Sequence, residues 1–141
     1  MLTTIERLLF LRGVRLFAQI PAEVLAQVAQ VTQVVHFAPG QQLVQQGDVA
    51  DCLYVLIDGE ADILVDNQRV TQRKVGEVLG ELGILDRRPR RATCVAVTEL
   101  SALKIDQDDF MVVLAENPEL VQGIIAVLIQ TLDEAVLKTS Q

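Results

Sequence analysis

The chain is poor in the residues on which many enzymes and metal sites depend. Its 141 residues include one histidine, two cysteines and no tryptophan. A Ser-His-Asp or Cys-His mechanism would have to use that histidine, His36, and a cupin-type metal centre needs several converging ligands. We therefore expect no enzyme activity and no metal site, and we expect His36 to lie on the surface of a strand.

The chain also lacks features of secreted and membrane proteins. Cys52 and Cys94 form no C-x-x-C pair, and nothing in the sequence indicates a disulfide between them. Charged residues interrupt any apolar region near the N-terminus, which argues against a signal peptide. The longest purely apolar run near the C-terminus, "GIIAVLI", is far shorter than the roughly 20 residues of a membrane span. We expect a cytoplasmic protein with two reduced cysteines and no membrane span.

Positive charge is scarce overall, with 12 Lys+Arg against 19 Asp+Glu and a net charge of -7. A nucleic-acid-binding surface is usually basic, so we expect no nucleic-acid partner. A small anion held in a local pocket is not excluded. The length suits one domain, residues 1–141.

The apolar pattern divides the chain into three parts. Residues 1–33 form a helical lead-in, in which Gly13 ends one helix and Pro21 opens the next. Residues 34–105 contain short segments rich in branched side chains, such as "VVHF", "CLYVLIDG" and "LSALKI", separated by turn signals that include the Asp66-Asn67 pair. Residues 106–141 return to helical spacing. This order predicts a mainly β fold, an antiparallel jelly-roll barrel with N-terminal helices and C-terminal lid helices.

Two helices are expected after the barrel. Asp106 is a good N-cap for the first, and Asn117-Pro118 marks the start of the second. The second helix carries an apolar stripe: Val121, Ile125, Leu128, Leu132 and Ala135. The stripe either packs on the barrel or forms a seam for a partner helix, which could make a homodimer.

Positive charge is concentrated in one segment, residues 80–93, "GELGILDRRPRRAT". Gly80 lets the backbone approach a ligand, and "GELGILD" is long enough for about two helical turns, whose first amides would favour an anion. Arg90 can grip two oxygens of a phosphate. Glu81 would repel a phosphate but can accept a hydrogen bond from a sugar hydroxyl. The segment therefore predicts a pocket for a sugar and a phosphate in one compact ligand.

This segment resembles the phosphate-binding cassette of the cyclic nucleotide-binding domain family, whose pattern is Gly-Glu, a short helix, Pro-Arg, a small residue, Ala and Thr or Ser. Gly80-Glu81-Leu82, Pro89-Arg90 and Ala92-Thr93 match it in identity and separation. The resemblance extends over nearly the whole chain, through "FAPGQQLVQQGDVADCLYVLIDGEADILV" and the flanking helical segments.

The resemblance implies a role for each matching residue. Glu81 would bind the ribose 2′-hydroxyl and Arg90 the cyclic phosphate, with backbone amides of Leu82 and Ala92 adding hydrogen bonds. The final helix would cap the purine, and its position makes Leu128 and Leu132 candidates.

Arg91 departs from the family pattern, which has Ser, Thr or Ala after the phosphate arginine. Its side chain either stacks on the purine or projects into solvent. The expected ligand is cAMP, with cGMP as the alternative, and no cofactor is expected.

Three hypotheses follow for the function. The first is a regulatory sensor domain that binds a cyclic nucleotide, moves its C-terminal helix and belongs to a larger protein with an unknown effector or partner. The second is a structural or interaction module of the same fold, in which Arg87, Arg88 and Arg91 form a solvated basic turn and Glu81 pairs with a helix end or with Arg90. The third, and weakest, is a cupin enzyme.

Overall fold

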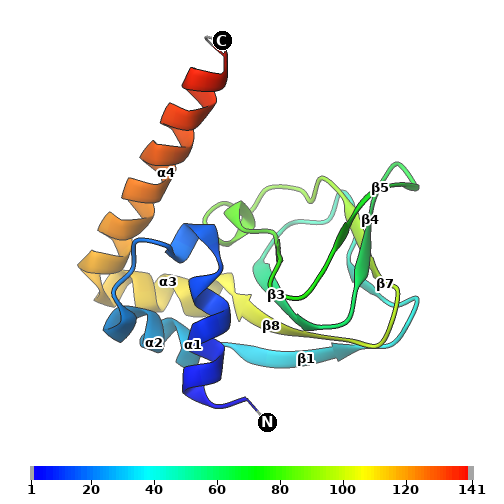
Figure 1. Ribbon diagram of the computed structural model, residues 1–141, viewed down its shortest axis with the longest axis horizontal. Coiled ribbons are helices and arrows are strands. Elements are labelled where there is room, and N and C mark those ends of the chain that lie inside the picture. Colours follow the sequence, from blue (N-terminus) through cyan, green and yellow to red (C-terminus); the bar gives the residue numbers. More distant parts are fainter. Residues whose placement is uncertain (1, 140–141) are drawn as a thin grey trace.

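The structure, a computed structural model, describes residues 2–139 as a barrel of two antiparallel sheets with helices gathered at one end (Figure 1). The first sheet has the order β1 (Gln33–Phe37), β8 (Leu100–Asp106), β3 (Cys52–Asp58), β6 (Val78–Leu79). The second has the order β2 (Gln42–Val44), β7 (Thr93–Ala96), β4 (Ala61–Val65), β5 (Gln68–Arg73). The predicted jelly roll is confirmed. The sequence did not predict β6, a two-residue strand.

The central strand β3 shows why the barrel and the helices form one packed unit. Cys52, Tyr54 and Leu56 are buried in the cluster that fills the barrel, whereas Leu53 and Val55 are buried in the cluster beneath the helices. Side chains alternate between the two faces of a strand, so a strand covered on both faces reads as an unbroken apolar run. This explains the segment "CLYVLI".

The hairpin between β4 and β5 confirms the turn predicted at Asp66-Asn67. Both residues have a positive φ, 53° at Asp66 and 66° at Asn67. Two-residue hairpin turns of this kind need a positive φ at both central positions, and Asp and Asn tolerate that conformation better than other residues with side chains. The turn therefore fixes the pairing of β4 with β5.

The helical end consists of α1 (Thr4–Arg12), the 3₁₀ helix η1 (Arg15–Phe17), α2 (Ala22–Gln30), α3 (Gln107–Glu116) and α4 (Pro118–Thr139). The predicted boundaries hold to within about a residue: Gly13 ends α1, Pro21 is the N-cap of α2, and Asp106 is the N-cap of α3. Phe17 of η1 and Phe110 of α3 pack with ring centroids 5.8 Å apart. The aromatic pair ties the N-terminal helices to those after the barrel.

Helix α4 packs with a different face from the predicted stripe. Its buried residues are Leu120, Gly123, Ile124 and Val127. The predicted residues are exposed: Val121, Ile125, Leu128, Leu132 and Ala135. The prediction that the stripe packs on the barrel is therefore wrong, because the helix carries two neighbouring apolar faces and the other one meets the protein. In Figure 1 the distal part of α4 projects away from the barrel.

Among residues 2–139, α4 is also the one helix long and apolar enough to cross a membrane by length and composition. Its most apolar 18-residue window has a mean hydropathy of 1.7 and is 22% buried. The sequence predicted no membrane span because no uninterrupted apolar run is long enough, whereas α4 passes the test because its few polar residues are averaged over the window. Such a helix is weak evidence for a span, since a helix packed on a soluble domain passes the same test.

Gly123 of α4 packs closely against the residues that follow η1. A Cβ at this position would collide with Ile20 Cδ1 and lie 3.1 Å from the Gln19 carbonyl oxygen. We expect Gly123→Val to lower the free energy of unfolding by about 1–3 kcal/mol, because overpacking a tight contact forces backbone shifts. Chemical denaturation measures this. The matched control is Gln122→Val on the exposed face of the same helix, and an equal loss in both variants would contradict the packing argument.

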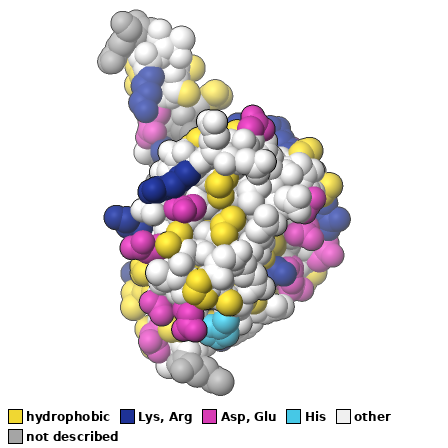
Figure 2. Space-filling view, turned by 90° about the vertical axis from the view of Figure 1, so that its right-hand side faces the viewer, with side chains coloured by type: hydrophobic (Ala, Val, Ile, Leu, Met, Phe, Trp, Pro, Cys, Tyr) yellow, Lys and Arg dark blue, Asp and Glu magenta, His cyan; other side chains and the backbone are white. Residues whose placement is uncertain are grey.

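Charges are mixed on the barrel surface. On the face shown in Figure 2, acidic side chains (magenta) and basic side chains (dark blue) are interspersed rather than gathered into a basic stripe. His36 is exposed on β1, as predicted, with Nδ1 2.7 Å from Ser101 Oγ.

Candidate functional site

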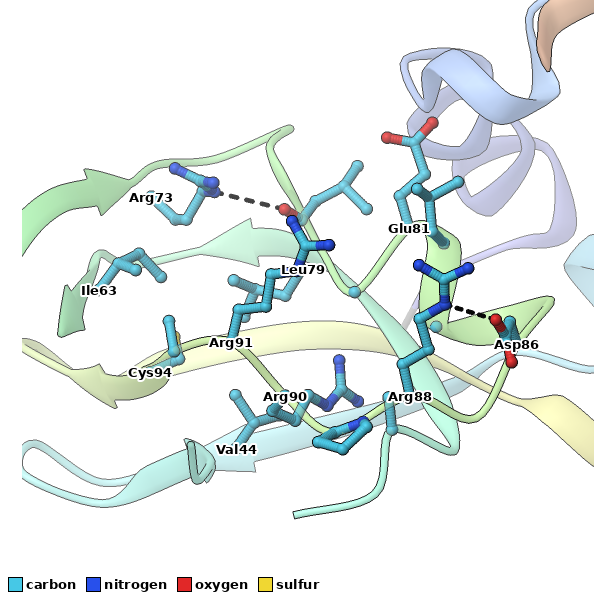
Figure 3. A pocket seen from close by; sticks show the side chains of 17 residues that line it. Val44, Ile63, Arg73, Leu79, Glu81, Asp86, Arg88, Arg90, Arg91 and Cys94 are labelled. Carbon is cyan, nitrogen blue, oxygen red and sulfur yellow. Dashed lines mark hydrogen bonds and ion pairs between the residues drawn. The ribbon is translucent and has the colours of Figure 1, made fainter. Parts of the chain in front are cut away.

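A cavity of about 420 Å³ opens between the barrel and the segment that joins β6 to β7. This volume lies in the range of ordinary small-ligand sites. One side, which we call the apolar wall, consists of Val44, Ile63, Leu79 and Cys94. The charged residues on its lining are Arg73, Glu81, Asp86, Arg88, Arg90 and Arg91 (Figure 3). The structure thus brings all six predicted cassette residues, Gly80, Glu81, Leu82, Arg90, Arg91 and Ala92, to one cavity.

Arg90 is held in place by its backbone and by its side chain. Its N–H donates to the Asp48 carbonyl at 2.7 Å, and its carbonyl accepts from the Gly47 N–H at 2.9 Å. The guanidinium Nη2 donates to the Cys52 carbonyl at 2.8 Å. Because the loop before β3 fixes the backbone on both sides, the guanidinium enters the cavity from a defined point.

Gly80 makes room for that guanidinium. Its φ is +73°, and a Cβ there would collide with Arg90 Nη1 and lie 3.1 Å from the Cys52 carbonyl oxygen. Any side chain at position 80 would be strained by the backbone and blocked by Arg90. The glycine of the Gly-Glu pair is therefore explained by its positive φ and by the close approach of Arg90 and the Cys52 carbonyl.

Glu81 lines the same cavity, but its carboxylate is turned toward the N-terminal helices (Figure 3). Oε1 accepts a hydrogen bond from the backbone N–H of Leu16 in η1 at 2.6 Å. Arg90 and Glu81 therefore share a cavity while their charged groups are bound to different parts of the protein. The sequence had no signal for this contact, since Leu16 lies far from the cassette along the chain.

The short helix of the cassette is smaller than predicted. Only η2 (Leu82–Ile84), a single 3₁₀ turn, forms where about two helical turns were expected. A turn this short has little macrodipole, so an anion would depend on Arg90 and on individual amides. Among the described residues, the N–H groups of Glu81 and Ala92 have no hydrogen-bond acceptor. Ile84 is fully buried in the helical cluster and anchors the segment there.

The other arginines of the cassette differ in their contacts. Arg87 donates to Gln107 and pairs with Asp108 at 2.7 Å, which joins the cassette to α3. Arg88 pairs with Asp86 at 2.5 Å and lies at the cavity.

Leu128 and Leu132 are not among the residues that line the cavity. Both lie on the exposed part of α4, which leads away from the barrel (Figure 1). The structure therefore does not bring the two candidate capping residues to the site.

Sequence reasoning missed the apolar wall and Arg73. These residues come from β2, β4, β5, β6 and β7, so no local pattern links them. Burial raises the pKa of the Cys94 thiol to about 11, which keeps it neutral near pH 7. The wall therefore offers an uncharged surface beside the arginines.

The jelly roll thus brings an apolar wall, the Arg90 guanidinium and the Gly80-Glu81 turn to one cavity of a size suited to a small ligand. Residues 34–117 match the family described as "Cyclic nucleotide-binding domain". This chain belongs to that family, as the cassette predicted.

Known proteins place the chain within the family. It is 32% identical over 103 residues to the cAMP-dependent protein kinase regulatory subunit of Emericella nidulans, covering 72% of this chain and 25% of that protein. The chain thus spans about a quarter of the length of this relative.

Solved structures agree on the fold. The N-terminal domain of a transcriptional regulator from Streptomyces coelicolor has a TM-score of 0.84 at 27% identity, covering 89% of this chain and 94% of that domain. The regulatory domain of Toxoplasma gondii PKA, crystallised with cAMP, has a TM-score of 0.72 at 20% identity, covering 93% of this chain and 50% of that one.

Proposed function

We propose that this chain is a regulatory sensor domain that binds cAMP and transmits binding to α4. The observation that carries the proposal is that Arg90, Glu81 and Gly80 line one cavity beside an apolar wall, with Gly80 leaving room for the Arg90 guanidinium. The similarity to a cAMP-dependent kinase regulatory subunit favours cAMP over cGMP as the first ligand to test.

Arg90 supplies the phosphate contact in this proposal. A guanidinium has five N–H donors, and Arg90 uses Nη2 on the Cys52 carbonyl. The remaining donors can bind two oxygens of a cyclic phosphate, and the N–H of Ala92 can add a third contact. The apolar wall would receive the purine.

Glu81 supplies the ribose contact and the link to the helices. An ionised carboxylate has about four lone-pair sites, and one is used by the Leu16 N–H. Because the carboxylate is turned toward η1, a ribose 2′-hydroxyl in the cavity would draw it away from the Leu16 N–H. Ligand binding is therefore coupled to η1.

From η1 the coupling continues to α4. Arg15 pairs with Glu134 at 2.5 Å, and Gly123 packs on the residues that follow η1. Both members of the ion pair are about half exposed, so the packing at Gly123 matters more than the pair. A ligand moves such an element only through its different affinities for two arrangements, typically by about 1–3 kcal/mol.

The domain senses and does no chemistry in this proposal, and it needs no resident cofactor. Its output would pass to an effector domain or partner protein in the cytoplasm. The exposed apolar side of α4 is available for that effector or for a second copy of the chain. No contact with nucleic acid or membrane is proposed.

A second candidate is an interaction module whose pocket binds nothing. It is favoured by the internal partners of the two key groups, since Glu81 is bound to Leu16 and Arg90 to Cys52. In this case the two contacts hold the cassette to the rest of the fold and have no other role.

Thermal unfolding with cAMP, cGMP and 5′-AMP separates the two candidates. We expect cAMP at 100 times its dissociation constant to add about 2.7 kcal/mol of stability. The open phosphate of 5′-AMP should add little. Isothermal titration with no heat from either cyclic nucleotide would support the interaction module instead.

A further inference from the structure

Arg91 is a cavity residue whose side chain is not engaged by the protein. Within residues 2–139 it makes no hydrogen bond and no ion pair. The other arginines of the cavity are engaged: Arg73 and Arg90 donate to backbone carbonyls, and Arg88 pairs with a carboxylate. Arg91 therefore has a planar cation free to meet a ligand.

The Arg91 side chain lies beside Leu79 of the apolar wall. In Figure 3 its side chain extends across the cavity toward the Leu79 segment, between Arg73 and Arg90 in this view. The residue is exposed, so it lies at the mouth, while Ile63, Leu79 and Cys94 of the apolar wall are buried. If one face of the purine base packs against the apolar wall, its other face is turned toward the mouth of the cavity.

Helix α4 does not cover that second face. No residue of α4 lines the cavity, and the helix projects away from the barrel (Figure 1). Among the residues that line the cavity, Arg91 at its mouth is the one placed to cover that face.

We propose that Arg91 caps the purine by stacking its guanidinium plane on the base and holding the base against the apolar wall. The inference rests on the proposed function, because it needs a cyclic nucleotide in this cavity. A guanidinium is planar and weakly hydrated, so it stacks on rings at a low desolvation cost. Stacking uses the face of the base and not its edge, so adenine and guanine are capped alike.

The test compares wild type, Arg91→Ala and Arg91→Lys by isothermal titration with three ligands. These are cAMP, cGMP and methyl riboside 3′,5′-cyclic phosphate, which lacks the base. We expect Arg91→Ala to weaken both nucleotides about 5- to 30-fold and to leave the base-free ligand unchanged. Arg91→Lys keeps the charge but not the plane, so it should recover only a small part of the loss. Leu128→Ala and Leu132→Ala are the matched controls and should stay within about 2-fold of wild type.

Each of the following results would overturn the cap. An equal loss for the base-free ligand would mean that Arg91 acts through charge alone. A loss confined to cGMP would mean that it reads the O6/N7 edge of guanine. A tenfold loss in Leu128→Ala or Leu132→Ala would return the cap to α4. If the wild type binds none of the three ligands, the proposed function and the cap are both wrong. If the wild type and Arg91→Ala bind cAMP with the same affinity, only the cap is wrong.

Discussion

Arg90→Ala is expected to abolish cAMP binding, with an affinity loss of more than about 100-fold. The reason is that two charge-assisted hydrogen bonds to the phosphate, each worth about 1.5–3 kcal/mol, disappear together. The other cavity arginines would remain, but Arg73 and Arg88 are engaged by the protein and Arg91 lies at the mouth, so no residue replaces the paired donors of Arg90. Isothermal titration of the purified variant measures the loss.

Arg90→Ala also removes the hydrogen bond to the Cys52 carbonyl, so the variant must be shown to fold. We expect a stability cost of about 1–3 kcal/mol from the unpaired carbonyl, readable by chemical denaturation. Arg87→Ala is the control within the same cassette, because Arg87 contacts α3 and does not line the cavity. Near-normal binding in a folded Arg90→Ala protein, or an equal loss in Arg87→Ala, would remove Arg90 from the site.

The features that the sequence predicted are those set by neighbouring residues. The hairpin at Asp66-Asn67 follows from side chains that tolerate a positive φ. The cassette follows from the local order of Gly80, Glu81 and Arg90, which share one short segment. These features could be predicted because each is fixed within a few positions of the chain.

The features that were missed depend on distant contacts. Glu81 is oriented by the Leu16 amide, which belongs to a different part of the chain. Strand β6 is two residues long and exists because Val78 and Leu79 pair with β3. The packed face of α4 is chosen by the close contact at Gly123, whereas hydropathy alone gives two candidate faces.

Glu81 has two roles in the proposed function, as the acceptor for the ribose 2′-hydroxyl and as the acceptor for the Leu16 N–H. Glu81→Gln should weaken cAMP binding about 10- to 100-fold, because a charged acceptor of the ribose hydroxyl becomes a neutral amide. The glutamine carbonyl can still accept from the Leu16 N–H, so the fold should persist. The matched ligand is 2′-deoxy-cAMP, which lacks the hydroxyl. We expect wild type and Glu81→Gln to bind it with nearly the same affinity.

The contact between Glu81 and Leu16 can also be used to test whether ligand binding changes the N-terminal helices. The Leu16 amide proton, 2.6 Å donor-to-acceptor from the carboxylate, should resonate downfield in a ¹H–¹⁵N spectrum. Saturating cAMP should move it upfield as the ribose hydroxyl draws Glu81 away, and 2′-deoxy-cAMP should leave it in place. If the protein binds cAMP tightly but neither ligand shifts the Leu16 resonance, then binding is not transmitted through the contact between Glu81 and Leu16. The signal would then have to reach α4 through Ile84 and α3, since η2 is also anchored in the helical cluster.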